Sequence, residues 1–313
     1  SYLAMNRTAT MKSSIDHSEL PGNSGNVIGA AELDVARRYC RSLARGHYEN
    51  FVVGSILIPR VYTQHLFNIY AFCRNSDDIA DEVGDANRSL ELLSDWRDDL
   101  KRCYGGRPTQ QTMIALQDTI STFDIPIKPF EDLISAFEQD CRVSRYETYE
   151  ELLSYSERSA NPVGRLFLWI FGYKDEERLG LSDNICTALQ LANFWQDVSE
   201  DYRRGRVYIP RQDLQQFGCD ESTIAEGRIT PAFRDMMRFE VARTQELLDI
   251  GAALPLMLDG RVRIDVELFR RGGMAVLEEI RRIEYSVIER RPRVSKFRQA
   301  LLFLSCIMGR CGK

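Results

Sequence analysis

Residues 189–210 read LQLANFWQDVSEDYRRGRVYIP, and this stretch decides the fold. It is apolar on nearly every side, which in a globular protein is typical of a buried helix. Asn193, Asp197 and Asp201 nevertheless recur every four residues, so they lie above one another on one face of that helix. Carboxylates that face an apolar interior are costly unless something positive meets them. The pattern therefore predicts a buried helix whose carboxylates hold a positively charged group.

A second stretch repeats this pattern. Residues 60–83 read as one long helix, on which Tyr70, Arg74, Asp77 and Asp81 share a face. A single pair of aspartates four residues apart is usually a solvated surface feature. Here both pairs lie among apolar and aromatic residues, whereas a solvated face would carry lysine and glutamate. Both pairs also have basic companions suited to a phosphate, namely Arg74 and the later Arg203, Arg204 and Arg206.

Carboxylates at helical spacing can supply oxygen ligands for Mg²⁺, which prefers one or two carboxylates, several waters and phosphate oxygens. If the two helices face each other, they can hold a Mg²⁺-diphosphate between them. The metal and Arg74 would neutralise the charge that develops as diphosphate leaves. Aromatic faces in an apolar cavity would stabilise the remaining cation and exclude water. The pattern predicts ionisation of an allylic or cyclopropylcarbinyl diphosphate, with a buried Arg–Asp ion-pair network as the alternative.

Composition excludes several other classes. The 313 residues carry a net charge of −5, whereas nucleic-acid binding needs a basic surface. The eight cysteines include no CxxC motif, which favours free thiols in a reducing compartment. The three histidines are too few for a histidine-rich metal site. No apolar run is long enough to span a bilayer, and residues 1–29, rich in Ser, Asn and Gly, are predicted to be a disordered segment without a signal peptide.

From residue 30 onward the periodicity is helical almost throughout. We expect helices over residues 32–45, 60–83, 89–104, 109–122, 129–142, 148–158, 163–172, 182–204, 231–257, 262–290 and 294–308, with Ser182 as the N-cap of the central one. Residues 206–210 and 218–229 read as loops. Without a strand series or a long linker, the sequence predicts a single all-α domain over residues 30–313 around a central apolar cavity. The apolar residues 301–308 form either the final packed helix or a contact with a membrane surface.

Four segments resemble the signatures of the squalene/phytoene synthase family, the trans-isoprenoid head-to-head synthases. They are residues 70–82 (YAFCRNSDDIADE), 146–167, 190–210 and 276–296. The resemblance covers roughly residues 31–304 and implies the isoprenoid-synthase fold. It implies Mg²⁺ at Asp77, Asp81, Asn193, Asp197 and Asp201, with help from Gln190, and diphosphate contacts from Arg74 and Arg290. It places Tyr70 and Tyr155 near the reacting carbons and Phe51 in a prenyl pocket.

Three of these residues can also be explained without a role in the reaction. Tyr155 and Phe51 are equally well explained as ordinary core residues, and Arg290 as a surface charge beside Arg291. The sequence also departs from the condensing members of the family. Gln196 replaces an arginine, SANPVG at residues 159–164 replaces a VAGTVG segment, and Gly273 stands where a tyrosine is expected.

With HYENF at residues 47–51, these departures resemble the hopanoid-pathway branch of the family, the hydroxysqualene synthases (HpnC). Members of that branch ionise and rearrange presqualene diphosphate and capture the cation with water. They need no NADPH, because reduction belongs to a separate flavoprotein. The resemblance thus implies a Mg²⁺-dependent lyase. We hypothesise that a polar group such as Gln196, Asn161 or Ser159 positions the water, and ordinary helix packing explains these side chains equally well.

Two other functions remain open. The chain could be a condensing enzyme that joins two farnesyl diphosphates, or a non-catalytic assembly or lipid-binding relative. The hydroxysqualene function implies coupling to a presqualene diphosphate synthase and to a flavin-dependent hydroxysqualene reductase. It implies a cytoplasmic location with transient contact at the inner membrane face, because the substrate is strongly apolar.

Overall fold

The structure, a computed structural model, describes residues 28–46, 58–82 and 84–307. Within these ranges the chain is helical, and a single β-bridge between Arg145 and Val207 is its one extended pairing. The prediction of an all-α fold is confirmed. The expected disordered segment lies almost wholly outside the described residues, as do HYENF and Phe51.

The first half of the chain forms seven described helices. They are α1 (Ala30–Gly46), α3 (Arg60–Glu82), α4 (Ala86–Tyr104), α5 (Gln111–Phe123), α6 (Lys128–Asp140), α7 (Tyr149–Ser159) and α8 (Asn161–Ile170). The second half follows with α9 (Glu176–Gln196), α10 (Val198–Arg203), α11 (Arg211–Gln216), α12 (Glu221–Ala225), α13 (Pro231–Ile250), the 3₁₀ helix η2 (Gly251–Met257), α14 (Gly260–Arg282) and α15 (Lys296–Ile307).

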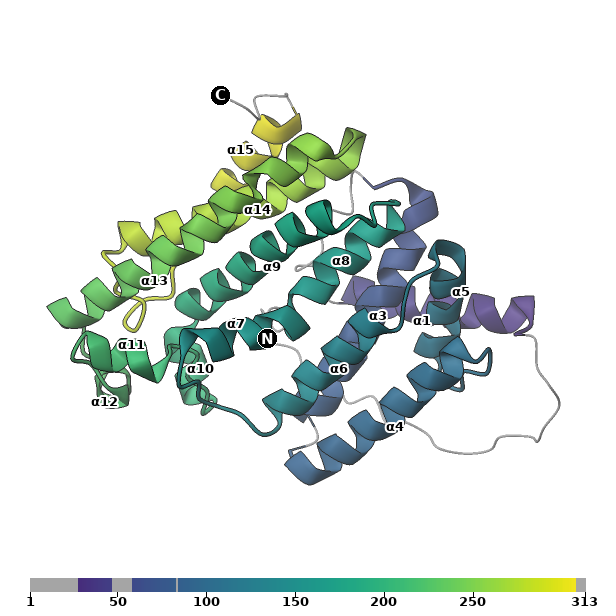
Figure 1. Cartoon of the computed structure of the whole chain (residues 1–313), viewed down its shortest axis with the longest axis horizontal. Helices are drawn as coiled ribbons and strands as arrows, with labels where there is room; N and C mark the ends of the chain where they lie inside the picture. Colours follow the sequence, from purple (N-terminus) through teal and green to yellow (C-terminus); the bar gives the residue numbers. More distant parts are fainter. Residues whose placement is uncertain (1–27, 47–57, 83, 308–313) are drawn as a thin grey trace.

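Two helices organise the packing (Figure 1). The central helix α9 packs against α13, α14 and η2 on one side and against α8 and α7 on the other. Helix α3 packs against α1, α4, α5 and α6. Helix α8 contacts both α3 and α9, so it joins the two groups. The aspartate stripes predicted from the sequence lie on these two organising helices.

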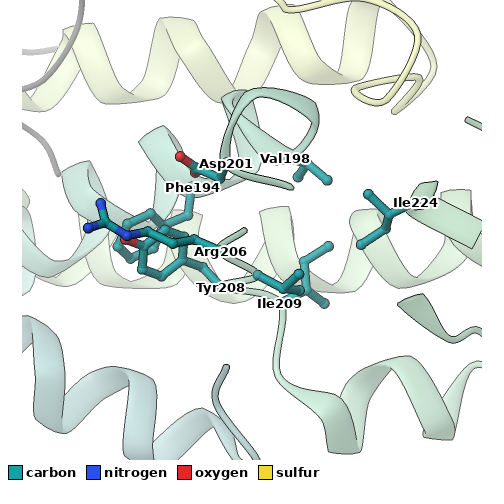
Figure 2. Close-up of a pocket in the computed structure, with 8 residues that line it drawn as sticks. Phe194, Val198, Asp201, Arg206, Tyr208, Ile209 and Ile224 are labelled. Carbon is teal, nitrogen blue, oxygen red and sulfur yellow. The ribbon is translucent and has the colours of Figure 1, made fainter. Parts of the chain in front are cut away.

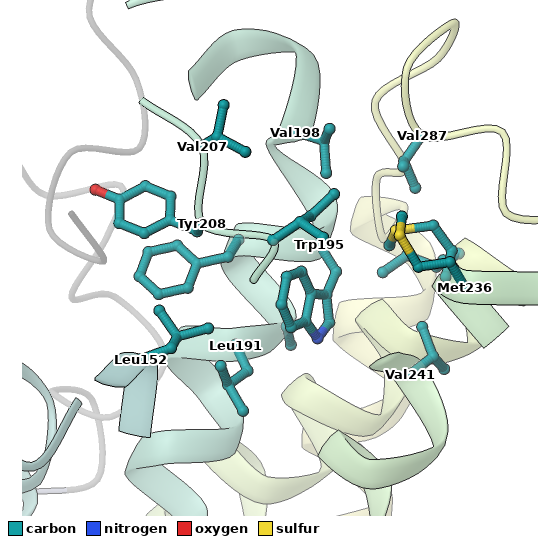
Figure 3. Packing of buried hydrophobic residues seen from close by; sticks show 14 of the residues in the cluster. Leu152, Leu191, Trp195, Val198, Val207, Tyr208, Met236, Val241 and Val287 are labelled. Carbon is teal, nitrogen blue, oxygen red and sulfur yellow. The ribbon is translucent and has the colours of Figure 1, made fainter. Parts of the chain in front are cut away.

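The core around α9 is closely packed. Trp195 is fully buried, and its indole N–H donates a hydrogen bond of 2.8 Å to the hydroxyl of Thr244 on α13. Figure 3 shows Trp195 near Leu191 on its own helix and near Met236 and Val241 of α13. Truncating a buried tryptophan to alanine typically costs about 3–5 kcal/mol of stability. This core fixes the position of the C-terminal end of α9, which carries the second stripe.

The central helix differs from its predicted boundaries. Asp175 caps it by accepting a hydrogen bond from the backbone N–H of Arg178 at 3.1 Å, and acidic residues follow in the first turn, where the helix dipole favours them. The predicted N-cap, Ser182, is wrong, because this residue is buried within the helix. The helix is also interrupted at Asp197, where α9 ends and α10 begins.

The second long helix of the C-terminal half is shorter than expected. Helix α14 ends at Arg282 rather than at residue 290, because the backbone of Glu284 and Tyr285 adopts positive φ angles of 53° and 59°. The chain then turns back toward α9. Helix α12 occupies part of the expected loop at 218–229, and η2 takes the last turns of the expected helix 231–257.

The predictions from composition concerned the cysteines and the absence of an apolar run long enough to span a bilayer. The seven cysteines in the described ranges are free thiols. Among the described residues, no helix combines the length and the hydropathy needed to cross a bilayer.

Candidate active site

The first stripe lies in the last turns of α3. Tyr70, Arg74 and Asp77 are buried there, with exposed fractions of 3%, 7% and 1%. Arg74 forms ion pairs with Asp77, at 3.4 Å, and with Asp78, a residue that the sequence analysis did not single out. Acidic residues at the C-terminal end of a helix face the negative end of its dipole, so they lower helix stability. Their presence here indicates a role other than stabilising α3.

The second stripe passes through the interruption between α9 and α10. The backbone N–H of Asp197 donates to the carbonyl of Asn193 at 2.9 Å, and that of Asp201 donates to the carbonyl of Asp197 at 2.8 Å. This pattern keeps the three residues in helical succession, as the sequence predicted. All three side chains are buried. The interior of the protein therefore contains two acidic carboxyl groups on this segment alone.

Arg206 links the two stripes. Its Nη2 donates to Oδ1 of Asp81 at 2.8 Å across 125 residues of sequence, and its backbone N–H donates to the carbonyl of Asp201 at 2.9 Å. Burial would lower the pKa of Arg206, but the Tyr208 hydroxyl and nearby carboxylates raise it above its ordinary value, so the guanidinium stays charged. The structure thus brings the two aspartate stripes together through one arginine.

A second arginine approaches from the C-terminal segment. Arg291 donates from Nε to Oδ1 of Asp197 at 2.5 Å and from Nη2 to Oδ2 at 3.1 Å, which is a bidentate pair. Arg290, which the sequence analysis assigned to the diphosphate, is exposed on the surface. The two side chains are neighbours in the sequence, but of the two only that of Arg291 pairs with Asp197. Arg291 therefore lies at the second stripe, and the expected diphosphate contact of Arg290 stays a prediction.

The buried acids of the second stripe are only partly compensated. Burial and, to a smaller extent, the negative charge of Asp197 raise the pKa of Asp201 to about 7. Burial also raises the pKa of Asp197, although its hydrogen bonds with Arg291 lower it. A bound cation would stabilise both ionised carboxylates. The electrostatics of this segment thus favour a positively charged ligand.

Asn193 and Gln190 differ in how their side-chain oxygens are satisfied. The Oδ1 atom of Asn193 is buried and has no hydrogen-bond partner among the described residues, as expected of a group that awaits a ligand. The side-chain oxygen of Gln190 accepts a hydrogen bond from Ser159 at 2.9 Å. Gln190 therefore already has a structural partner.

The oxygen atoms of the two aspartate stripes fit a Mg²⁺ ion that is also coordinated by a phosphate. Within the described ranges, no three acidic, histidine or cysteine side chains are grouped closely enough to hold a metal by themselves. Mg²⁺ does not need such a cage, because it commonly takes one or two carboxylates and fills its remaining positions with water and phosphate oxygens. The metal-binding role of the two stripes stays a prediction.

Aromatic rings lie beside the second stripe. Tyr155 is fully buried, and its ring stacks with those of Phe194 and Tyr208 at centroid distances of 6.4 and 6.3 Å. Its hydroxyl donates to Oδ2 of Asp140, at the end of α6, at 3.0 Å. Figure 2 shows a small crevice here, where the guanidinium of Arg206 lies beside the ring of Tyr208. Its lining is Phe194, Val198, Asp201, Arg206, Val207, Tyr208, Ile209 and Ile224.

The three candidates for positioning water all have hydrogen-bond partners. The amide of Gln196 donates to the carbonyl of Pro292 at 2.6 Å. Thr187 donates to Oδ1 of Asn161 at 2.9 Å, and Ser159 donates to Gln190. Gln196 therefore holds the C-terminal segment that carries Arg291, a contact that helical spacing alone did not reveal.

Sequence reasoning missed Asp78, Asp140, Tyr208 and Arg291. Arg291 is separated from Asp197 by 94 residues, and Asp140 from Tyr155 by 15, so no local spacing connects them. For Asp78 the sequence did contain a signal, because this residue directly follows Asp77 of the first stripe.

Fold and site together define a class of protein, namely an all-α bundle in which one arginine joins two acidic helix segments. The sequence profile of the squalene/phytoene synthase family matches residues 44–298, and the chain belongs to this family. The resemblance found from the sequence is confirmed.

Individual relatives agree with this membership. A phytoene synthase of Arthrospira platensis is 30% identical over 283 residues, which cover 84% of this chain and 89% of that protein. The crystal structure of squalene synthase HpnC from Alicyclobacillus acidocaldarius is similar at 42% identity and a TM-score of 0.78, covering 83% of this chain and 99% of that one. A dehydrosqualene synthase structure with 21% identity and a TM-score of 0.79, covering 90% and 98%, shows the shared fold.

Proposed function

We propose that this protein is a Mg²⁺-dependent enzyme that converts presqualene diphosphate into hydroxysqualene. The observation that carries the proposal is the meeting of the two aspartate stripes at Arg206, with Arg291 against Asp197. A site with several buried acids and arginines suits a ligand that brings both cations and anionic phosphates. Similarity to the HpnC structure, at 42% identity, supports this branch of the family.

The metal ligands in this proposal are the residues expected from the sequence. Asp77 and Asp81 would hold Mg²⁺ from α3, and Asn193, Asp197 and Asp201 from the α9–α10 segment. Bound Mg²⁺ supplies positive charge that stabilises the departing diphosphate. Arg74, Arg206 and Arg291 can exchange carboxylate partners for phosphate oxygens, because guanidinium binds both in the same bidentate geometry.

The aromatic side chains would serve the cation that remains. Tyr70 lies one turn before Arg74, and Tyr155 lies in the aromatic stack beside the second stripe. Their rings and oxygen atoms can stabilise positive charge, while the packed stack excludes bulk water. Burial raises the pKa of Tyr70 to about 12, so its hydroxyl remains protonated at neutral pH.

The test is a product assay with purified protein. We expect presqualene diphosphate with Mg²⁺ to give hydroxysqualene without NADPH, and farnesyl diphosphate alone to give no product. Turnover of farnesyl diphosphate alone would instead support the second candidate, condensation of two farnesyl diphosphates. The names of the relatives, which include phytoene and dehydrosqualene synthases, favour that candidate. Absence of turnover with either substrate would favour a non-catalytic relative.

Gln196 is our candidate for positioning the captured water. It stands where condensing members have arginine, and its amide already anchors the segment that carries Arg291. We expect Gln196→Ala to lower the share of hydroxysqualene among the products. An unchanged product distribution would remove Gln196 from this role and leave it as a packing residue.

The proposed reaction implies neighbours in a reaction sequence. An enzyme that makes presqualene diphosphate must supply the substrate, and a flavin-dependent reductase would consume hydroxysqualene. The proposed scheme requires neither NADPH nor a nucleic-acid partner.

We further propose transient contact with a lipid surface through α15. This helix exposes Phe297, Leu301 and Leu304, with exposed fractions of 74%, 50% and 50%, at helical spacing on one side. It contains no acidic residue, and Lys296 and Arg293 are exposed beside it, which favours anionic headgroups.

Sedimentation with lipid vesicles tests the contact. Wild-type protein should sediment more with vesicles that contain an anionic lipid than with neutral ones. Replacing the three apolar residues with serine should abolish the difference. The control is Val61→Ser, which removes a side chain that is 67% exposed on α3. Equal sedimentation of the triple variant and wild type would exclude α15 as the contact.

A further inference from the structure

Asp140 is a carboxyl group that the proposed function does not yet use. It is the last residue of α6, and its Oδ2 accepts the hydrogen bond from the Tyr155 hydroxyl at 3.0 Å. Burial raises its pKa to about 6, while the positive charge of Arg206 lowers it. Asp140 therefore lies within the electrostatic reach of the arginine that joins the two stripes.

The contact with Tyr155 determines what that hydroxyl can offer. A phenol has one donor hydrogen and oxygen lone pairs that can accept. Because the hydrogen points to Asp140, only the lone pairs remain for any other neighbour. The ring cannot move easily, since it is fully buried and stacks with Phe194 and Tyr208. A fixed hydroxyl whose hydrogen is already donated can offer only lone pairs to a nearby cation.

Arg206 is held from two directions. Its guanidinium donates to Asp81 of α3 at 2.8 Å, and its pKa is raised by the carboxylates of both Asp81 and Asp140. Figure 2 shows the same guanidinium beside the ring of Tyr208. Asp140 thus adds a third element, α6, to the acids that surround Arg206.

We propose that Asp140 is a positioning residue, which fixes the hydroxyl of Tyr155 so that its lone pairs are available to the substrate cation. The proposal rests on the proposed function, in that it requires a prenyl diphosphate substrate. It does not depend on which prenyl diphosphate is turned over. Preorganised dipoles of this kind act on the transition state more than on substrate binding. The effect should therefore appear in kcat.

The variants are Asp140→Ala, Asp140→Asn, Tyr155→Phe and the double variant Asp140→Ala/Tyr155→Phe. The amide oxygen of asparagine can still accept the phenol hydrogen, so Asp140→Asn tests rescue by a conservative change. The matched control is Asp99→Asn on α4. Asp99 is also a carboxylate that accepts from a hydroxyl, that of Thr109 at 2.8 Å, with Arg102 at 3.1 Å beside it.

We expect Asp140→Ala to lower kcat about 10- to 100-fold, because the loss of a partner that orients a functional group typically has such an effect. KM and the affinity for Mg²⁺-pyrophosphate should change less than the turnover. Asp140→Asn should recover part of the loss. The double variant should be no slower than Tyr155→Phe, since Asp140 acts through Tyr155. Asp99→Asn should keep the wild-type kcat even if it lowers the thermal midpoint.

Several outcomes would overturn the inference. One is a wild-type kcat for Asp140→Ala. Another is that Asp140→Ala lowers kcat by the same factor in wild type and in Tyr155→Phe. That result would mean that Asp140 acts independently of the Tyr155 hydroxyl. If wild type turns over only farnesyl diphosphate, the hydroxysqualene proposal fails while these comparisons still test Asp140. If wild type turns over neither substrate, both proposals fail.

Discussion

Arg290 and Arg291 are neighbours in the sequence, yet only Arg291 reaches the candidate site. Its guanidinium forms a bidentate pair with Asp197, whereas Arg290 is exposed. Residue type alone therefore does not determine which arginine reaches the site, because the backbone path between α14 and α15 decides which side chain faces Asp197.

This contrast gives a test with an internal control. Arg291→Ala should weaken pyrophosphate binding in the presence of Mg²⁺ by about 10- to 100-fold, since a hydrogen bond to a charged group contributes about 1.5–3 kcal/mol. Arg290→Ala should stay within about threefold of wild type, as a surface charge contributes little. Isothermal titration calorimetry measures both. Equal effects of the two substitutions would contradict the assignment.

Asp265 provides a pH prediction away from the stripes. It is 1% exposed on α14, and neither carboxyl oxygen has a hydrogen-bond partner within the described ranges. Burial raises its pKa to about 7, although Arg261 lowers it. Between about pH 4 and pH 7 the folded state keeps a proton that the unfolded state has lost. The contribution of Asp265 to stability therefore falls as pH rises through this window.

Asp265→Asn removes this titration. At pH 8 the variant should be more stable than wild type by up to about 4 kcal/mol, an upper bound set by roughly three pKa units at about 1.4 kcal/mol each. At pH 4 the difference should be small. Chemical denaturation at both pH values gives the two free energies of unfolding. A difference that does not depend on pH would show that Asp265 titrates normally.

At the scale of the elements, the close approach of α8 to α9 depends on Gly164. A Cβ atom at this position would lie 2.4 Å from Sγ of Cys186 and 2.5 Å from Oγ of Ser182. Both neighbours belong to α9, the helix that carries the second stripe. The residues before Gly164 are those that depart from the condensing members of the family, so this departure lies at a helix–helix contact.

Gly164→Ala should destabilise the protein by about 1–3 kcal/mol, which is the usual cost of overpacking. The control is Gly180→Ala within α9, where no atom lies within 4 Å of the added Cβ. That change should raise stability by about 0.5–1 kcal/mol through helix propensity. Thermal denaturation of the two variants should therefore give shifts of opposite sign. A stabilising Gly164→Ala would mean that α8 and α9 separate at little cost.

At the scale of the whole molecule, the site is assembled from distant parts of the chain. Arg206 and Asp81 are 125 residues apart, and Arg291 and Asp197 are 94 apart. A ligand that binds this assembly must stabilise the folded state as a whole, because the unfolded chain does not hold these groups together.

We expect Mg²⁺ and pyrophosphate together to raise the thermal midpoint more than either does alone. At about 100 times the dissociation constant the stabilisation is about 2.7 kcal/mol. The increase should be reduced in Asp81→Asn. Differential scanning calorimetry with and without a chelator provides the measurement. No joint effect would favour the alternative of a structural Arg–Asp network.

The sequence by itself determined the fold class, the helices and the two aspartate stripes. These follow from local spacing, because the periodicity of apolar residues and the four-residue repeat of Asn193, Asp197 and Asp201 are properties of a single helix. The family resemblance rests on the same segments. The sequence therefore contained enough to place the site on α3 and α9.

The tertiary structure alone decided which side chains complete that site. Arg291 and Asp140 reach Asp197 and the Tyr155 hydroxyl through the packing of the whole core. The sequence had already singled out Arg206, but its pairing with Asp81 also depends on that packing. The interruption at Asp197 and the end of α14 at Arg282 have the same origin. Local propensity sets where helices form, but burial and charge pairing between distant segments set where they stop and what they face.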